Sequence, residues 1–479
     1  ERKLQRALES LVDRPQDEVI RGVAALEAEH AGRRRYPWQK LGLSPLAMAL
    51  EPLAQLATLC QTAPGAPSPD AYAAAYASAG WRVDAAALAT MAACGSPELH
   101  GAVLGTLRAV YLPWLDNTAR HLQQLIHANG QSVSRRAKPI ETAPGRLVVF
   151  ADGLRMDVAQ QLAAKLAAAG VESTQDWEWS AIPSVTATAK PAASPIADAV
   201  QGRDPGDEFA ARLISTDQLL TQDRFAAALK ARGWQFLGAH ETGDPTGSAW
   251  TEAGALDKRG HTEGWKLARS VESEVHDMVS RIVVLLRAGW TEVLVVTDHG
   301  WLLVPNGLPK VELKAFFTET RWSRCAALKT AAQTDALAFK WHWNPAVMMA
   351  SPPGAGSFRA GIEYSHGGVS LQEMVTPVLR VKAAHVAEGV ARLQEVKWTG
   401  AKCRVTVSGP ITGVRVDVRT SQGEPDSSLL PDKLARETTA DGKVTVFLEN
   451  DADIGNQAEI VLLDASGQVI HSLPTTLGQ

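Results

Sequence analysis

The segment at residues 293–299 constrains the fold most, because the apolar run Val-Leu-Val-Val ends abruptly in a Thr-Asp-His sequence. Four apolar residues in a row predict a strand that is buried on both faces of a parallel sheet. Asp298 and His299 then follow the carboxyl end of that strand, where open α/β sheets bind ligands. A second apolar strand, at residues 147–151, runs in the same way into Asp152. Two buried strands that deliver acids to one edge of a sheet make a metal site the leading hypothesis.

The composition narrows the class of protein. A chain of 479 residues predicts two to four domains, and its hydrophobic fraction of 45% is enough to bury a large core. A net charge of −4 argues against a protein that coats nucleic acid, although it leaves room for a local basic groove. Four scattered cysteines indicate reduced thiols in a cytoplasmic protein, and no apolar run reaches membrane-spanning length. The chain begins with Glu1 instead of Met, which leaves open that it is a piece of a longer polypeptide.

Three regions differ in the spacing of their apolar residues. Residues 1–140 show helical spacing, and Pro113 is expected to kink the last of their helices. Residues 146–385 alternate strands with helices, with later strands expected at 346–350 and 375–381. Residues 395–479 change to a period of two, which predicts a small β-sandwich of immunoglobulin-like type. The predicted fold is therefore α/β, with a mostly parallel sheet flanked by helices, an N-terminal helical region and a C-terminal sandwich for docking or stabilisation.

Five short segments carry residues suited to chemistry, and each has an ordinary structural alternative. Asp152 is as readily a helix-capping residue, and His366 alone is more often a plain core or surface histidine. One interpretation of Asp257 and His261 is a loop pair, with Gly260 breaking any helix and Thr262 capping the next helix. Only the Asp298-His299 pair favours a functional role without help. The segments in chain order are 149–155, 182–188, 256–263, 295–300 and 365–377.

Taken in order, these segments resemble the alkaline phosphatase superfamily, especially its phosphodiesterase branch. Within it, the chain resembles the PglZ family of BREX phage-defence systems over residues 146–385. The carrying sequences are Val-Phe-Ala-Asp-Gly-Leu-Arg, Ile-Pro-Ser-Val-Thr-Ala-Thr, Leu-Asp-Lys-Arg-Gly-His-Thr-Glu, Val-Val-Thr-Asp-His-Gly and Ser-His-Gly-Gly-Val-Ser-Leu-Gln-Glu-Met-Val-Thr-Pro.

This resemblance implies two divalent metal ions. One would be held by Asp152, Thr186, Asp298 and His299, and the other by Asp257, His261 and His366. Many members of that family carry Asp where this chain has His261. A histidine there favours zinc, although manganese accepts the same mixture of nitrogen and oxygen ligands.

The resemblance also implies that Thr186 is a nucleophile. A threonine hydroxyl is a poor nucleophile at neutral pH, but a bound divalent ion lowers its pKa and orients it. Attack on phosphorus would give a phosphothreonine that water then hydrolyses. Arg155, Lys190 and Arg259 lie beside the motifs and are candidates to bind a phosphate oxygen, although solvated surface charges are an equal interpretation of each.

Three functions follow as alternatives. The first is a metal-dependent phosphodiesterase or nuclease, a hydrolase of ester bonds that acts on nucleic acid or a nucleotide together with other BREX proteins. The second is an assembly subunit of the defence complex with little or no catalysis. The third is a phosphatase of small molecules. Retention of all seven candidate ligands argues against a decayed site, since the loss of one would suffice.

Overall fold

The computed structural model describes residues 1–63, 65–95, 97–133, 139–203, 206, 208–313, 322–328, 337–382, 391–409, 411, 413–439, 441–465 and 467–478. The chain forms two compact units, Glu1–Ala383 and Ala384–Gln479. Among the described residues, no helix has both the length and the apolar character needed to cross a membrane.

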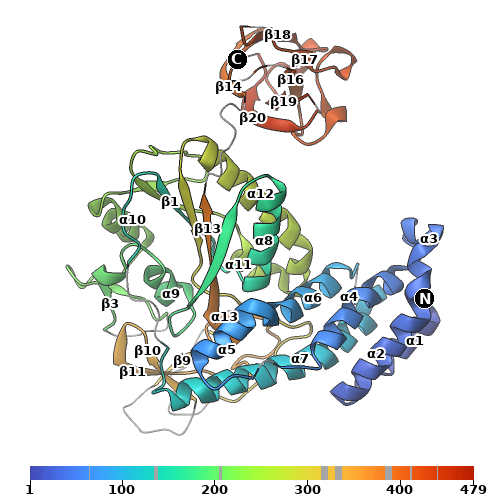
Figure 1. The fold of residues 1–479 in the computed structure, drawn as a ribbon, viewed down its shortest axis with the longest axis vertical. Helices are drawn as coiled ribbons and strands as arrows, with labels where there is room; N and C mark the ends of the chain where they lie inside the picture. The colour runs from blue at the N-terminus through green and yellow to red at the C-terminus, as the bar shows by residue number, and fades with distance from the viewer. Residues whose placement is uncertain are drawn as a thin grey trace. The chain divides into compact units, whose positions relative to one another are not determined.

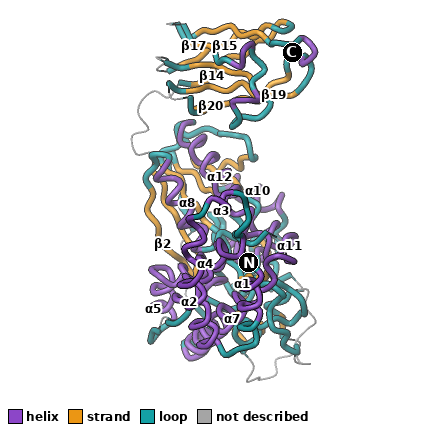
Figure 2. Tube along the Cα trace, turned by 90° about the vertical axis from the view of Figure 1, so that its right-hand side faces the viewer, coloured by secondary structure: helices purple, strands orange, loops and turns teal. Residues whose placement is uncertain are grey.

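The first unit begins with a set of helices that pack on one another (Figure 2). Their apolar residues recur every three or four positions, so each helix buries one stripe, as Leu4 and Leu8 do in the first. The long helix α7 continues through Pro113, where the sequence predicted a kink. The helices are α1 (Arg2–Glu9), α2 (Gln16–His30), α3 (Pro37–Lys40), α4 (Pro45–Leu59), α5 (Pro69–Ala75), α6 (Trp81–Ala92) and α7 (Pro97–Ala128).

A six-stranded sheet forms the centre of this unit, with the strand order β2-β13-β7-β1-β6-β5. Strands β7, β1, β6 and β5 are parallel, whereas β13 is antiparallel to both of its neighbours. The sheet is therefore mostly parallel, as predicted. Its strands are β1 (Arg146–Phe150), β2 (Ser173–Trp179), β5 (Trp234–Leu237), β6 (Ser248–Glu252), β7 (Glu292–Val296) and β13 (Val375–Lys382).

Helices cover both faces of the sheet (Figure 1). Leu147 and Val149 of β1 pack into the core beneath α8 (Met156–Ala168) and α12 (Leu267–Arg287), while Val148 and Phe150 pack on the side of α10 (Gln222–Ala231). Successive side chains of a strand point to opposite faces, so burial on both faces requires an unbroken apolar run. The doubly buried strand predicted from the sequence is confirmed.

Smaller elements complete the unit. The strand predicted at 346–350 exists as part of β11 (Asn344–Ala350), but it pairs with β10 (Ala338–Trp341) and β9 (Ala326–Ala327) in a separate sheet. The remaining elements are α9 (Thr186–Ala192), β3 (Val200–Gln201), β4 (Arg212–Leu213), α11 (Leu256–Glu263), β8 (Leu302–Leu303), β12 (Tyr364–Ser365) and α13 (Leu371–Met374).

The second unit is rich in strands and consists of two antiparallel sheets that share one apolar core. The alternation expected from the sequence is present, because Cys403, Val405 and Val407 are buried and the residues between them are not. One sheet contains β14 (Arg392–Thr399), β15 (Lys402–Ser408) and β18 (Lys443–Phe447). The other contains β17 (Arg436–Glu437), β16 (Arg415–Arg419), β19 (Gln457–Leu463) and β20 (Val469–Thr476).

Candidate metal centre

Five segments that are far apart in the sequence meet at one edge of the central sheet. Strands β1 and β7 end there, and Asp152, Asp298 and His299 follow them directly. Strand β2 ends at the same edge and leads to Thr186, the first residue of α9. Because β13 is antiparallel, its first residue lies at this edge, so the preceding loop carries His366 to the same place. The strand directions therefore explain the convergence of the motifs.

Two buried carboxylate oxygens at this edge have no hydrogen-bond partner among the described residues, namely Asp152 Oδ1 and Asp298 Oδ2. The other oxygen of Asp298 accepts a hydrogen bond from the backbone amide of His299 at 3.0 Å. A buried carboxylate oxygen that lacks a partner loses its hydration without compensation, which is costly. Both orphaned oxygens lie near His299 Nε2, at 3.6 and 3.5 Å respectively. Such an arrangement could hold a cation.

Backbone carbonyls orient two of the imidazoles. His299 Nδ1 lies 3.1 Å from the carbonyl oxygen of Gly300, and His366 Nδ1 lies 3.0 Å from that of Ser184. A carbonyl can only accept, so each Nδ1 donates a hydrogen bond, and Nε2 of the neutral form of each ring has a lone pair that can bind a metal. Metal-binding histidines are held in the same way, by a hydrogen bond from the second ring nitrogen. The two rings stack with 3.8 Å between their centroids, so the two histidines belong to one cluster.

A second group of ligand atoms adjoins the first. His366 Nε2 lies 3.1 Å from His261 Nε2 and 3.3 Å from Asp257 Oδ1. Asp257 also groups with Asp152 and His299, and the ligand atoms within each trio lie within 4.8 Å of one another. The seven residues named from the sequence thus form one contiguous cluster in which Asp257 is shared.

The segment with Asp257 and His261 is helical, which corrects the interpretation of these residues as a loop pair. Helix α11 runs from Leu256 to Glu263, so the two side chains are one turn apart on the same face. Gly260 does not break the helix. A glycine is needed at this position, because a β-carbon there would lie 2.2 Å from the Tyr364 ring. The glycine allows the helix to approach that ring closely.

Thr186 lies at the border of the cluster and is half-buried. Its Oγ1 is 3.3 Å from His299 Nε2. When the ring is neutral with its hydrogen on Nδ1, this nitrogen accepts a hydrogen bond from the threonine hydroxyl. The hydroxyl therefore faces the candidate ligands and remains accessible to a substrate.

Two carboxyl groups of the cluster, those of Asp152 and Asp257, have shifted pKa values. Burial, together with the charges of Asp298 and Asp257, raises the pKa of Asp152 well above its ordinary value. Burial acts in the same direction on Asp257, but His366, His299 and His261 outweigh it and hold the pKa of Asp257 below its ordinary value. Burial also lowers the pKa of His366, to about 3. His366 is therefore a neutral imidazole at physiological pH, the form that binds a metal.

The three candidate substrate-binding cations are placed differently. Lys190, one turn after Thr186 on α9, forms an ion pair with Glu252 at 2.8 Å and is close enough to counteract the rise in the pKa of Asp152. Arg259 forms ion pairs with Glu263 and Glu274 along α11 and α12. Arg155 is buried against Asp157. Of the three, only Lys190 is brought beside the cluster.

Two residues that contact the cluster were missed by the sequence reasoning. Tyr364 donates a hydrogen bond from its hydroxyl to Asp257 Oδ1 at 2.9 Å, and Ser184 provides the carbonyl that orients His366. Tyr364 stands two residues before His366, but no local pattern distinguishes such a tyrosine from a core residue. A pocket of about 350 Å³ opens beside these groups, lined by His261, Trp322, Ser323, Arg359, Ile362, Tyr364, Ser365 and His366.

These residues fit the divalent ions implied by the sequence. Three carboxylates, three imidazoles and a hydroxyl supply nitrogen and oxygen donors. The charge of Lys190 alone does not neutralise the three acids. The orphaned oxygens and the inward-facing lone pairs are what a metal would satisfy. The structure does not itself select zinc over manganese.

Comparisons with known proteins give limited likenesses. No protein-family model matches the chain, and no curated protein matches it. Solved structures with some likeness include murine ectonucleotide pyrophosphatase / phosphodiesterase 5, with a TM-score of 0.32 and 12% identity over 49% of this chain and 87% of that one. The human ectonucleotide pyrophosphatase / phosphodiesterase 5 gives a TM-score of 0.31 and 10% identity over the same shares. Likenesses at this level establish neither a family nor an activity for the chain.

Proposed function

We propose that the chain is a metal-dependent phosphodiesterase that uses Thr186 as its nucleophile. The observation that carries the proposal is the position of Thr186 Oγ1, 3.3 Å from His299 Nε2. This hydroxyl borders a cluster in which two buried carboxylate oxygens have no hydrogen-bond partner among the residues that the structure describes. A structural threonine would have no reason to face such a group of acids and imidazoles.

The candidate ligands divide into two sets that share a border. Asp152, Thr186, Asp298 and His299 would hold one divalent ion, most suitably zinc, with manganese as the alternative. Asp257, His261 and His366 would hold the other, with Asp257 placed close to both sets. When bound, the two ions would supply positive charge that lowers the pKa of the threonine hydroxyl and stabilises the phosphate oxygens.

The chain's own residues account for the rest of the chemistry. Thr186 Oγ1 would form a bond to phosphorus and lose its proton to solvent, while the bond from phosphorus to the leaving alcohol oxygen breaks and that oxygen takes up a proton. Water would then cleave the phosphothreonine and restore the hydroxyl. His299 lies against the nucleophile and would share the first metal with it, and Lys190 is available to bind an oxygen of the substrate or to balance Glu252.

The test combines two variants of Thr186 with the stereochemistry of the reaction. Thr186→Ala should retain metal yet lose turnover of an aryl phosphodiester by on the order of 10³-fold or more, and Thr186→Ser should keep part of the activity. A covalent nucleophile inverts phosphorus twice, so a chiral thiophosphate diester should be hydrolysed with retention. Net inversion would show that water attacks directly and that Thr186 is not the nucleophile.

The preferred substrate is proposed to be a diester, which nucleic acids and nucleotides both provide. Of the three cations named from the sequence, only Lys190 lies beside the cluster, and its ammonium is already paired with Glu252, so none of these three provides a strong clamp for a monoester dianion. We expect kcat/KM for an aryl diester to exceed that for the matched monoester. A strong preference for the monoester would favour the small-molecule phosphatase instead.

The cellular role is proposed from the five sequence segments alone. Their order and composition support a place among the proteins of a bacterial BREX phage-defence system, in the cytoplasm. Phage protection in cells should be lost with Thr186→Ala if catalysis is required. Full protection by that variant would favour the role of an assembly subunit.

A further inference from the structure

Two completely buried ion pairs lie behind the candidate metal centre. Arg155 bonds to Asp157 at 2.6 Å, and Arg324 bonds to Glu373 at 2.7 Å, and each of the four side chains is at most 1% exposed. Each guanidinium contacts both oxygens of its carboxylate. Burial of two charges is costly, and such pairs are often replaceable by apolar residues without loss of stability. The other hydrogen bonds that each pair makes therefore indicate why the pair is buried there.

The Arg155 pair joins the turns that follow β1 and β7. Arg155 stands three residues after Asp152, and its Nη1 donates to the carbonyl oxygen of Trp301, two residues after His299, at 3.3 Å. Its guanidinium also lies 3.7 Å from the centroid of the Trp301 ring. The pair thus ties the turn that carries Asp152 to the turn that carries His299.

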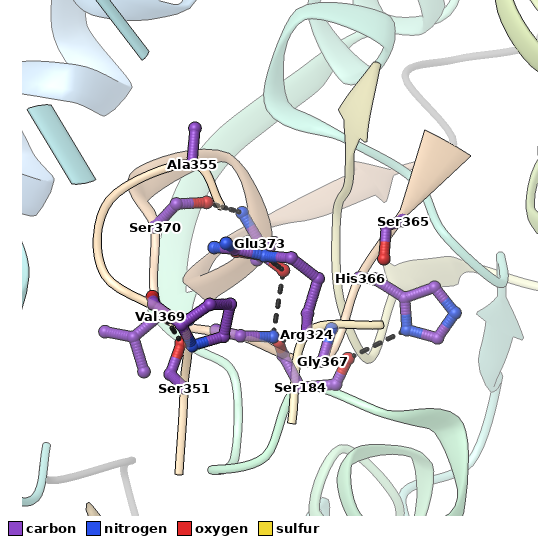
Figure 3. A network of polar contacts seen from close by, with 12 residues as sticks. Ser184, Arg324, Ser351, Ala355, Ser365, His366, Gly367, Val369, Ser370 and Glu373 are labelled. Atoms are coloured by element: carbon purple, nitrogen blue, oxygen red, sulfur yellow. Dashed lines mark hydrogen bonds and ion pairs between the residues drawn. The ribbon is translucent and has the colours of Figure 1, made fainter. Parts of the chain in front are cut away.

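The Arg324 pair holds the loop that carries His366 (Figure 3). Glu373 Oε1 accepts a hydrogen bond from the backbone amide of Gly368 at 2.9 Å, and Arg324 donates to the carbonyl oxygens of Gly354 and Gly356. A β-carbon on Gly368 would lie 2.8 Å from the guanidinium. The second glycine of the Ser-His-Gly-Gly sequence is thereby explained, since it admits Arg324 against the backbone.

The same loop sets the orientation of the His366 ring. The amide of Gly367 donates to the Ser184 hydroxyl at 3.2 Å, and that hydroxyl donates to the carbonyl of Gly368 at 2.9 Å. The Ser184 carbonyl accepts from His366 Nδ1 (Figure 3). A shift of the loop would therefore move the ring as well as its backbone.

We propose that the two ion pairs are positioning residues for separate halves of the metal centre. Arg324 and Glu373 set His366, and through it the metal that it shares with Asp257 and His261. Arg155 and Asp157 set Asp152 and His299, and through them the other metal. This inference rests on the proposed function, because it assigns a purpose to residues behind that site.

The first measurement needs no metal. Arg324→Lys keeps the charge, but one ammonium cannot bond both carboxylate oxygens and two carbonyls as the guanidinium does. In the metal-free chain, amide hydrogen exchange should accelerate in residues 365–370 of this variant and remain unchanged in residues 152–156. Arg155→Lys is the matched control and should produce the opposite pattern.

The second measurement is a calorimetric titration of the metal-free chain with zinc. Arg324→Lys should weaken one of two bound metals by about 10–100-fold, the usual effect of losing support behind a ligand. His366→Ala should weaken the same metal. In the His366→Ala background, Arg324→Lys should cause no further loss, because residues that act through one another are not additive. Arg155→Lys should weaken the metal that remains.

A second variant distinguishes a general loss of stability from the selective loss of one metal. Arg324→Met combined with Glu373→Gln removes both charges at similar volume, so it should fold and still show the selective loss. Equal weakening of both metals, a further loss in the His366→Ala background, or unchanged exchange and affinity would each overturn the inference while the metal centre stands. No tight zinc binding by the unmodified chain would overturn the proposed site and this inference together.

Discussion

Two fully buried aspartates, one in each compact unit, differ in how many hydrogen-bond partners their oxygens have. In the second unit, Asp417 accepts from the Val418 amide at 2.8 Å and the Ser428 hydroxyl at 2.6 Å with one oxygen, and from Arg419 Nε at 2.8 Å with the other. In the first unit, Asp298 has one satisfied oxygen and one that has no partner within the described part of the chain. A fully paired acid stabilises a fold, whereas an acid left partly unpaired is retained at a cost and indicates a ligand.

Substitution of Asp298, the partly unpaired acid, should have the largest effect, and this effect is on catalysis. We expect Asp298→Asn to reduce diester turnover by on the order of 10³-fold or more and to lower the bound zinc, because a metal ligand is lost. The metal-free variant should be at least as stable as the parent, since the charge of Asp298 is one of those that raise the pKa of Asp152. Turnover in a steady-state assay and denaturant unfolding in a chelator measure the two effects. Native turnover in this variant would contradict the metal assignment.

A third buried acid lies between these two cases and predicts a pH effect. Asp84 accepts from the hydroxyls of Tyr76 and Tyr111, which are neutral partners, and burial raises its pKa to about 6. A carboxyl whose pKa is higher in the folded state contributes stability below its unfolded value of about 4, and that contribution is lost as the pH rises through about 6. We expect a decline of about 2–3 kcal/mol in unfolding free energy across this interval.

Asp84→Asn should remove that decline. The new amide oxygen keeps an acceptor for one of the two tyrosines, and Gln372, whose amide nitrogen donates to Asp84, can turn its Oε1 toward the new NH2 group. Denaturant unfolding of both chains at pH 4.5 and pH 7.5 makes the comparison. An equally steep decline in the variant would show that another group titrates.

The expected effect on Asp417 is smaller and confined to stability. Asp417→Asn removes the charged partner of Arg419, and we expect a loss of about 1.5–3 kcal/mol from the second unit. Diester turnover should be unchanged, in contrast to the Asp298 variant. Thermal unfolding followed alongside activity tests this, and a joint loss of turnover would break the distinction between the two acids.

The smallest expected effect comes from removing the second unit. Its apolar residues form a core of their own, and no candidate ligand lies in it among the described residues. A chain that ends at residue 382 should keep its kcat/KM for a diester and lose partner binding or protection in cells. A soluble, folded truncation without turnover would show that the second unit contributes to the chemistry.

Local patterns in the sequence were enough to find several parts of the molecule. An unbroken apolar run reports burial on both faces of a strand, so the positions of β1 and β7, and of the acids after them, followed directly. The change to a period of two marked the strand-rich second unit. These properties depend on neighbours within a few residues, which is the range that periodicity measures.

Other features depended on distant parts of the chain. Gly260 was expected to break a helix, but α11 continues through it, and the position of the Tyr364 ring explains why a glycine stands there. Arg155 was expected at the substrate, but Asp157 and Trp301 hold it in the core.

The sequence by itself therefore determined which residues are suited to bind metal and which strands deliver them. The tertiary structure decided that β13 is antiparallel and so brings His366 to the edge where β1 and β7 end. It also decided which acids remain unpaired, because a carboxylate's partners come from segments that can lie more than a hundred residues away. Strand order and side-chain pairing are long-range properties of the packed chain, and no local spacing encodes them.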